Sequence, residues 1–262
     1  MLGAEEQIQN SPIPPLQREG IGATAFRIKG LIPVSLLDWP GRVCAIVFLG
    51  GCGFRCPACH NPRLVLEHHS MPDVALEDVL EDLESRRGWI DGITVTGAEP
   101  TATADLPKLL AILKTTGLKI KLDTNGSNPS MLQALVQGSL VDAVSMDVKA
   151  PVTEEEYARV AGVPVNPRII ASSIEILKKF SIEVAFRTTV VPGLVEEPEL
   201  QRIRDFLGDV ARFQVQPFRN RETLDPALAD VQPFTPERFE HMRRLFELPS
   251  VITRPQRYAF AG

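Results

Sequence analysis

Short apolar runs rich in valine and isoleucine alternate with helical patterns along most of this chain. Six such runs occur, near residues 43–49, 92–96, 118–122, 141–148, 182–190 and 212–216. Between them, apolar residues recur three or four positions apart, as at Leu106, Leu109 and Leu113. The runs indicate strands covered on both faces, and the intervening periodicity indicates amphipathic helices. About six strand–helix units in succession predict a parallel sheet with right-handed crossovers.

We therefore expect an α/β fold, and specifically a partial, about six-stranded, TIM-like parallel barrel. A flat, doubly wound sheet is the alternative. Residues 1–22 are polar and interrupted by prolines, which predicts a flexible N-terminal tail. No linker-like composition interrupts residues 23–262, and 44% of the 262 residues are hydrophobic. A single domain with a sizeable core is the simplest interpretation of this stretch.

Charge and hydropathy exclude several classes of partner. The formal net charge is -5, and no long run of lysine and arginine occurs, which argues against nucleic acid or an anionic membrane as the main partner. No apolar stretch approaches the roughly 18 residues that span a bilayer, and the first twenty residues lack the pattern of a signal peptide. We expect a cytoplasmic protein that binds neither nucleic acid nor membrane.

Polar or glycine-rich segments follow each of the predicted strands. In order along the chain they are Gly50-Gly51-Cys52, Gly97-Ala98-Glu99, Asp123-Thr124-Asn125, Asp147-Val148-Lys149, Arg187-Thr188-Thr189 and Gln216-Pro217-Phe218. Individually, the Asp and Asn residues could stabilise local turns, and the cations could be surface charges. Because the carboxyl ends of parallel strands lie at the same end of the barrel or edge of the sheet, the position of all six segments after strands favours a common site.

Three of the four cysteines, Cys52, Cys56 and Cys59, fall within eight positions after the first strand. Three thiolates at this spacing can reach three corners of a cubane iron–sulfur cluster, and no further cysteine follows to bind the fourth iron. Two alternatives are a zinc site completed by His60 and covalent haem at the Cys-x-x-Cys-His pattern. Haem attachment of this kind normally follows export, for which no signal is visible. We expect Cys44, inside a strand, to be a buried inert thiol.

Two further histidines, His68 and His69, lie in a polar stretch. We expect both of them to be solvated.

The cysteine loop, followed after the second strand by Gly97-Ala98-Glu99-Pro100, resembles the radical S-adenosylmethionine (SAM) superfamily. The run from Leu31 to Gly41 and the run from Cys59 to Pro62 look like the activating proteins of anaerobic ribonucleoside-triphosphate reductase. The runs from Leu122 to Gly126 and from Val190 to Gly193 are similar to pyruvate formate-lyase activating enzyme. The resemblance covers the chain from about Arg27 onwards and implies a barrel of the radical SAM type.

This resemblance implies an oxidoreductase with two cofactors, one 4Fe-4S cluster and SAM. Cys52, Cys56 and Cys59 would hold the cluster as its metal ligands and form the catalytic centre, with SAM on the fourth iron. Reductive cleavage of the S–C5′ bond would give methionine and a 5′-deoxyadenosyl radical, which takes a hydrogen atom from the substrate.

The resemblance also implies which residues bind SAM. The methionine amino group would be received by Gly97, Ala98 and Glu99. The ribose and carboxylate regions would be contacted by Asp123, Asn125, Lys149 and Arg187. Alternatively, Asp123 and Asp147 could share a monovalent cation beside the SAM carboxylate.

Two residues depart from the family pattern. Ala58 stands where an aromatic residue usually precedes the third cysteine and packs near the adenine, so adenine needs another wall. Ala98 replaces the second glycine of the turn, and we expect strain there if the position requires a positive φ.

The resemblance implies a protein substrate, a glycyl-radical enzyme such as anaerobic ribonucleotide reductase, and a flavodoxin- or ferredoxin-like electron donor. The single group of clustered cysteines argues against an auxiliary cluster. One alternative is a radical SAM enzyme that acts on another peptide or on a small molecule. From a different class, the alternative is a non-catalytic iron–sulfur or zinc protein.

Overall fold

The computed structural model describes residues 26–247, and all its strands join in one sheet. The strands follow their chain order across the sheet from edge to edge. They are β1 (Ile28–Ser35), β2 (Cys44–Leu49), β3 (Gly92–Gly97), β4 (Lys119–Thr124), β5 (Ala143–Asp147), β6 (Glu183–Val190) and β7 (Phe213–Pro217). Strands β2 to β7 are parallel, as predicted, and β1 and β7 are not paired with each other. The open, partial parallel barrel is confirmed.

Strand β1 was not predicted, and it pairs antiparallel with β2. An eight-residue connection joins the two strands, from Leu36 to Val43, so the two-residue turn that marks many hairpins is absent. Irregular register on both sides of the segment from Gly30 to Ile32 further weakens the strand pattern. Ile32 and Val34 are exposed, as residues on the outer side of an edge strand can be.

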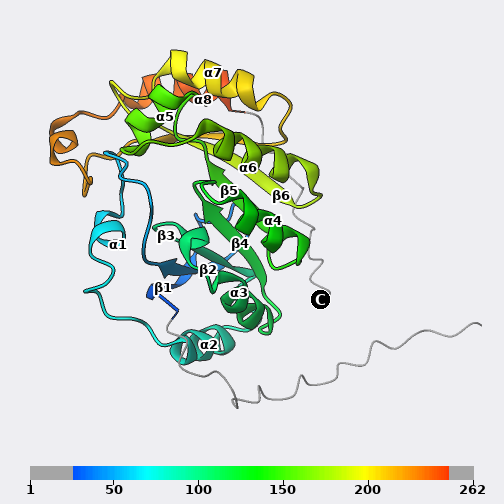
Figure 1. The fold of residues 1–262 in the computed structure, drawn as a ribbon. Helices are drawn as coiled ribbons and strands as arrows, with labels where there is room; N and C mark the ends of the chain where they lie inside the picture. The colour runs from blue at the N-terminus through cyan, green and yellow to red at the C-terminus, as the bar shows by residue number, and fades with distance from the viewer. Residues whose placement is uncertain (1–25, 248–262) are drawn as a thin grey trace, which may run out of the picture.

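The helices fill the connections between strands and cover the outside of the sheet (Figure 1). They are α1 (Pro62–Leu66), α2 (Leu76–Ser85), α3 (Leu106–Lys114), α4 (Pro129–Gln137), α5 (Glu154–Ala161), α6 (Pro167–Lys179), α7 (Glu197–Leu207) and α8 (Pro236–Phe246), with short 3-10 helices η1 (Pro100–Ala102) and η2 (Pro226–Asp230). Helix α4 packs beside α6, α7 packs beside α8, and α8 packs against β7. Asn128, Thr153 and Thr235 cap the N-termini of α4, α5 and α8.

Strand β4 shows how a strand separates an apolar face from a more polar one. On β4, Ile120 and Leu122 are buried in the main hydrophobic core, whereas Lys121 and Asp123 point to the opposite face and form an ion pair. Lys121 is only 3% exposed, so the polar face is covered as well.

The predicted N-terminal tail, residues 1–22, lies outside the described residues, so its flexibility stays a prediction. The single domain predicted for residues 23–262 also stays a prediction. Within residues 26–247, no helix is both long enough and apolar enough to cross a membrane.

Candidate active site

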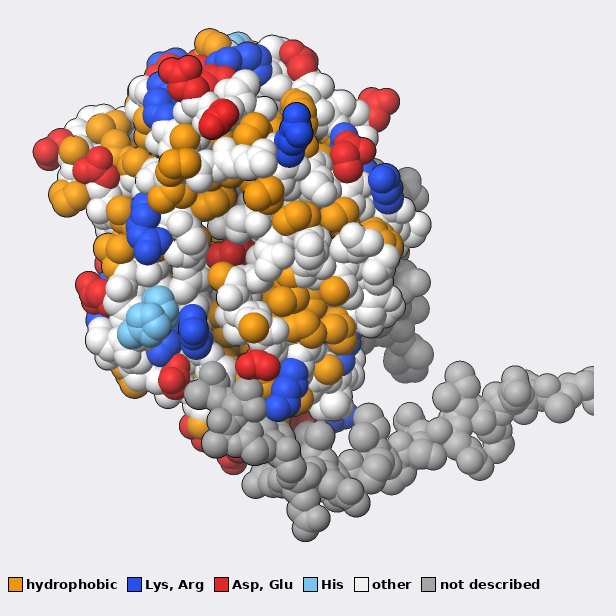
Figure 2. Space-filling model, in the orientation of Figure 1, with side chains coloured by type: hydrophobic (Ala, Val, Ile, Leu, Met, Phe, Trp, Pro, Cys, Tyr) orange, Lys and Arg blue, Asp and Glu red, His pale blue; other side chains and the backbone are white. Residues whose placement is uncertain are grey.

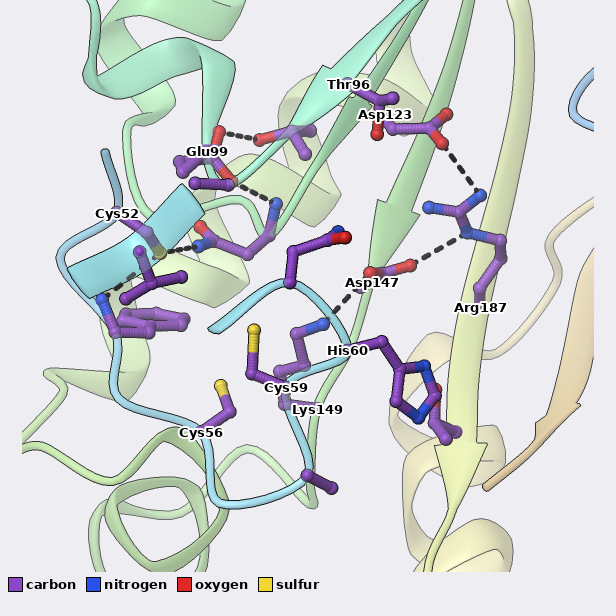
Figure 3. A pocket seen from close by; sticks show the side chains of 18 of the residues that line it. Cys52, Cys56, Cys59, His60, Thr96, Glu99, Asp123, Asp147, Lys149 and Arg187 are labelled. Atoms are coloured by element: carbon purple, nitrogen blue, oxygen red, sulfur yellow. Dashed lines mark hydrogen bonds and ion pairs between the residues drawn. The ribbon is translucent and has the colours of Figure 1, made fainter. Parts of the chain in front are cut away.

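A cavity of about 380 Å³ opens at the carboxyl ends of the strands and is lined by every predicted site residue (Figure 3). These residues are Cys52, Cys56, Cys59, Gly97, Ala98, Glu99, Asp123, Asn125, Asp147, Lys149 and Arg187. On the face drawn in Figure 2, acidic atoms lie at the bottom of a hollow with hydrophobic side chains on its rim. The volume falls within the range of about 300 to 1,000 Å³ that is typical of small-molecule sites.

Backbone contacts from α5 hold the cysteine loop in place. The N–H of Arg55 donates to the carbonyl oxygen of Ala161 at 2.8 Å. Gly162 ends α5 with a left-handed φ of +69°, and a Cβ there would stand 2.0 Å from the Arg55 carbonyl oxygen. Phe54 meets the ring of Tyr157 edge to face, with centroids 6.4 Å apart. The helix and the loop are therefore fitted to each other at the backbone level.

The three loop thiols are free, and all of them are partly buried. Burial raises the pKa of the Cys52 thiol to about 12, against a weaker lowering by the Phe54 N–H. Burial also raises the pKa of Cys56, and the Lys149 ammonium opposes that shift. Without metal the thiols of Cys52 and Cys56 are protonated at neutral pH, so binding of a metal by these two residues would release protons. Cys44 is fully buried at the start of β2 and accepts a hydrogen bond from Thr94 at 3.5 Å, as expected of an inert thiol.

The turn after β3 lies directly against the end of β2. The N–H of Ala98 donates to the Leu49 carbonyl at 2.9 Å, and the N–H of Glu99 donates to the Gly51 carbonyl at 3.0 Å. The Asn61 side chain, from the cysteine loop, donates to the Gly97 carbonyl at 3.2 Å. The turn and the cysteine loop therefore form one hydrogen-bonded unit.

The condition under which strain was expected at Ala98, a positive φ, is not met. Among the described residues outside glycine, only Ser139 and Glu222 have a positive φ. The position that requires glycine is Gly97, with a φ of +120°, where a Cβ would stand 2.3 Å from the Leu49 carbonyl oxygen. The close approach of β2 and β3 explains the glycine, and Ala98 adopts ordinary backbone angles.

Glu99 is buried to 1% exposure and accepts hydrogen bonds on both carboxylate oxygens. Its Oε1 accepts from the N–H of Thr101 at 3.1 Å, from the Thr101 hydroxyl at 2.6 Å and from the Thr124 hydroxyl at 2.7 Å. Its Oε2 accepts from the N–H of Asn125 at 2.6 Å. Burial raises the pKa of Glu99, and these donors oppose the shift. Glu99 thus ties the turn after β3 to the end of β4.

Arg187 lies between Asp123 and Asp147 and bonds to both (Figure 3). Its Nε is 2.8 Å from Oδ1 of Asp147, and its Nη1 is 3.1 Å from Oδ2 of Asp123. Lys149 Nζ is 2.9 Å from the second oxygen of Asp147. Burial acts to raise the pKa of Asp147, but the charges of Arg187 and Lys149 outweigh it and hold that pKa well below its usual range. The shared monovalent cation stays a prediction, and Arg187 already places one positive charge between the two carboxylates.

Asn61, Asp38 and Gln216 are among the cavity residues that were not predicted as site residues. Asn61 supplies the contact to Gly97, and Asp38 and Gln216 line the cavity from the β1–β2 connection and from β7. Asn61 lies within the run from Cys59 to Pro62, but its role could not be predicted because its contact with Gly97 depends on how the cysteine loop packs against the turn after β3.

The predicted solvation of His68 is wrong. His68 is 8% exposed, and a Cβ on Gly50 would lie 2.6 Å from the Cβ of His68. The glycine leaves room for the imidazole against the backbone just before Cys52. His69 is exposed, as predicted.

Comparisons with known proteins show the family of this chain. The family profile described as the radical SAM superfamily matches residues 46–206. A candidate glycyl-radical enzyme activating enzyme of Methanocaldococcus jannaschii is 30% identical over 76% of this chain and 82% of its own length. The pyruvate formate-lyase-activating enzyme of Streptococcus mutans is 30% identical over 80% of this chain and 86% of its own length.

Solved structures show a similar fold. A structure of TYW1 with a lysine-pyruvate adduct bound superimposes with a TM-score of 0.54 and 13% identity, covering 78% of this chain and 72% of that one. An archaeal TYW1 gives a TM-score of 0.50 and 12% identity, covering 77% and 70%. At this identity the likeness concerns the fold alone.

Proposed function

The chain belongs to the radical SAM superfamily of enzymes, and we propose that Cys52, Cys56 and Cys59 hold the 4Fe-4S cluster at which it cleaves SAM. When bound and reduced, the cluster supplies the electron that breaks the S–C5′ bond of SAM. The observation that carries the proposal is that three thiols of the loop after β2 share a cavity with polar residues from the ends of the five strands β3 to β7. The fourth cysteine, Cys44, does not line that cavity, so one iron would lack a protein ligand.

The arrangement of the ligands supports a cluster over a single zinc ion. In residues 26–247, no three His, Cys, Asp or Glu side chains come together as ligands of one metal ion. A cubane binds each thiolate at a separate iron, whereas tetrahedral zinc needs all its ligands around one point. His60, the fourth ligand of the zinc alternative, instead places Nε2 3.1 Å from the carbonyl oxygen of Arg219.

The charges in the cavity suit the polar end of SAM. Lys149 and Arg187 offer cations to its carboxylate. The backbone around Gly97 and Ala98 and the Glu99 carboxylate offer acceptors to its amino group. Asp123 and Asn125 lie on the adjoining strand end, where they can bind ribose hydroxyls. In this proposal the chain's own residues bind and orient SAM, and the ion pairs around Arg187 fix the two acidic side chains.

Apolar side chains offer the adenine wall that Ala58 cannot provide. Val191 and Leu194 line the cavity after β6. His60 also lines it and stacks on Phe218, with ring centroids 6.2 Å apart and planes 25° from parallel. A flat imidazole held by a second ring can pack against a nucleobase.

The substrate that we propose is a glycine Cα–H on a glycyl-radical enzyme. Both relatives described above are named for activation, one of glycyl-radical enzymes and one of pyruvate formate-lyase. The runs Leu31 to Gly41 and Cys59 to Pro62 make anaerobic ribonucleotide reductase the first partner to test, with a flavodoxin- or ferredoxin-like protein as electron donor. The alternative is a radical SAM enzyme acting on another peptide or on a small molecule.

Anaerobic reconstitution tests the cofactor assignment. Protein with iron and sulfide added should bind four irons per chain, and dithionite with SAM should yield 5′-deoxyadenosine. Cys56→Ala should lose the cluster and the product, whereas Cys44→Ala, the matched control, should retain both. Full cluster binding in Cys56→Ala, or a stable cluster that never cleaves SAM, would contradict the proposal.

A second experiment tests the substrate. With a candidate partner, reductant and SAM, electron paramagnetic resonance should show a persistent glycyl radical. The doublet splitting should collapse when glycine is deuterated at Cα, and a glycine-to-alanine change in the partner should remove the signal. If a free small molecule is instead consumed in proportion to 5′-deoxyadenosine, the alternative substrate class is correct.

A further inference from the structure

The side-chain amide of Asn125 is directed at the first cysteine of the loop. Its Nδ2 lies 3.6 Å from Sγ of Cys52 and donates a hydrogen bond to it. Asn125 is 6% exposed and directly follows β4. The contact therefore joins two strand ends that lie 73 residues apart in the sequence.

Neighbouring contacts fix which end of this amide faces the sulfur. Oδ1 of Asn125 accepts the backbone N–H of Ser127 at 2.9 Å. Because a backbone N–H can only donate, the atom facing Ser127 must be the oxygen, and the NH₂ group faces Cys52. The backbone N–H of Asn125 is held in turn by Glu99 Oε2 at 2.6 Å.

Cys52 differs from the other two loop cysteines in its hydrogen bonding. Its Sγ also accepts the backbone N–H of Phe54, at 3.3 Å. In the part of the chain that the structure describes, no other residue donates a hydrogen bond to the thiol of Cys56 or Cys59. Cys52 therefore has two hydrogen-bond donors to its thiol, whereas the thiols of Cys56 and Cys59 receive none from another residue within 26–247.

We propose that Asn125 is a positioning residue that raises the reduction potential of the cluster through its hydrogen bond to Cys52. A reduced cluster carries one more negative charge, and a donor to a ligand sulfur stabilises that charge more in the reduced than in the oxidised state. This inference rests on the proposed function, since it requires Cys52 to ligate a 4Fe-4S cluster. It gives Asn125 a role toward the cluster in addition to any contact with SAM.

Two substitutions remove the donor and keep the acceptor for Ser127. Asn125→Ser retains a short oxygen that can accept the Ser127 N–H but cannot reach Cys52. Asn125→Asp retains Oδ1 and turns a second, negatively charged oxygen toward the sulfur. Asn128→Asp is the charge control, because it keeps an N-cap acceptor for α4 three residues away, where Asn128 bonds to Met131 and Thr101 and to no thiol.

Spectroelectrochemical titration of the reconstituted proteins without SAM measures the potential directly. At equal iron content, the potential should fall from wild type to Asn125→Ser and fall further in Asn125→Asp. Asn128→Asp should stay at the wild-type value. The reduced cluster's electron paramagnetic resonance spectrum should change in the two Asn125 variants only.

Other outcomes overturn the inference in distinguishable ways. Unchanged potentials in both Asn125 variants, with weaker SAM binding, would make Asn125 a SAM contact only. Loss of iron from both variants with intact circular dichroism would show a purely structural role. If the wild-type chain binds no 4Fe-4S cluster, both the proposed function and this inference fail. If the wild-type chain cleaves SAM but the two Asn125 variants keep the wild-type reduction potential, this inference alone is refuted.

Discussion

Gly162 lies so close to Arg55 that a Cβ on the glycine would stand 2.0 Å from the carbonyl oxygen of Arg55. Because Arg55 sits between two of the loop cysteines, the end of α5 sets the path of the predicted cluster loop. The contact is to backbone, which cannot rotate away as a flexible side chain can.

We expect Gly162→Ala to lower cluster occupancy as well as stability. A left-handed backbone costs a non-glycine residue about 1 to 2 kcal/mol, and the clash with Arg55 adds to that cost. Gly117→Ala is the matched control, because Gly117 has a φ of +78° with nothing within 4 Å of the added Cβ. Iron content and melting temperature should both fall in Gly162→Ala, and only the melting temperature should fall in the control. Equal iron content in both would show that the loop adapts.

Gly97→Ala should have a severe effect on SAM binding, whereas Ala98→Gly should have only a small effect on stability. The first places a methyl group 2.3 Å from the Leu49 carbonyl oxygen, so it should separate β3 from β2 and abolish SAM binding. The second relieves no strain, because Ala98 has no positive φ, and should cost at most about 1 kcal/mol of stability through a looser unfolded chain. Equilibrium dialysis with SAM and urea denaturation measure the two effects. Tighter SAM binding in Ala98→Gly would show that the methyl group obstructs the ligand.

The six parallel strands of the sheet could be predicted from the sequence, whereas the antiparallel edge strand β1 could not. Strands β2 to β7 fall where the apolar runs predicted them, because a strand buried on both faces needs continuous apolar character. Strand β1 was not predicted because it is an edge strand. Its apolar residues Ile32 and Val34 are exposed, so apolar and polar residues do not separate cleanly onto a buried and an exposed face. The pairing of β1 with β2 is a tertiary contact, and no local sequence pattern indicates it.

The candidate site was predictable to the level of which residues meet, because all eleven predicted residues line one cavity. Their partners were not predictable, since the contacts of Arg187 with Asp123 and of Asn125 with Cys52 depend on strand register. His68 was misplaced because the space it fills is made by a glycine eighteen residues earlier. The electron donor, the cytoplasmic location and the absence of nucleic-acid and membrane partners stay predictions.

The reactivity of Cys52 in the metal-free protein should depend steeply on pH. With its pKa raised by burial to about 12, only about one thiol in ten thousand is ionised at pH 8. The rate of alkylation by iodoacetamide should therefore rise about tenfold per pH unit from pH 8 to pH 10. Peptide mapping by mass spectrometry follows this residue alone. A rate at Cys52 that levels off near pH 9 would show that its pKa is not raised.

Asp147→Asn should destabilise the fold by about 2 to 3 kcal/mol at neutral pH, because it leaves Arg187 and Lys149 with a reduced counter-charge in a partly buried cluster. Since the folded-state pKa of Asp147 is depressed, its contribution is complete above about pH 4 and is lost as the pH falls below that value. The difference from wild type in urea denaturation should shrink accordingly on acidification. Asp82→Asn, which breaks the partly exposed ion pair with Arg86 at the end of α2, should change the stability much less than Asp147→Asn does.

His60→Ala separates the cluster from the zinc alternative. If His60 were a metal ligand, its loss would release metal; if it is part of the adenine wall, metal content should stay constant and SAM binding should weaken. The structure favours the second outcome, because His60 stacks on Phe218 and its Nε2 faces the Arg219 carbonyl oxygen. Loss of one aromatic contact of about 1 kcal/mol corresponds to about a fivefold rise in the dissociation constant for SAM. Metal analysis and SAM titration on one preparation give both readings, and a fall in metal content with unchanged SAM affinity would restore the zinc alternative.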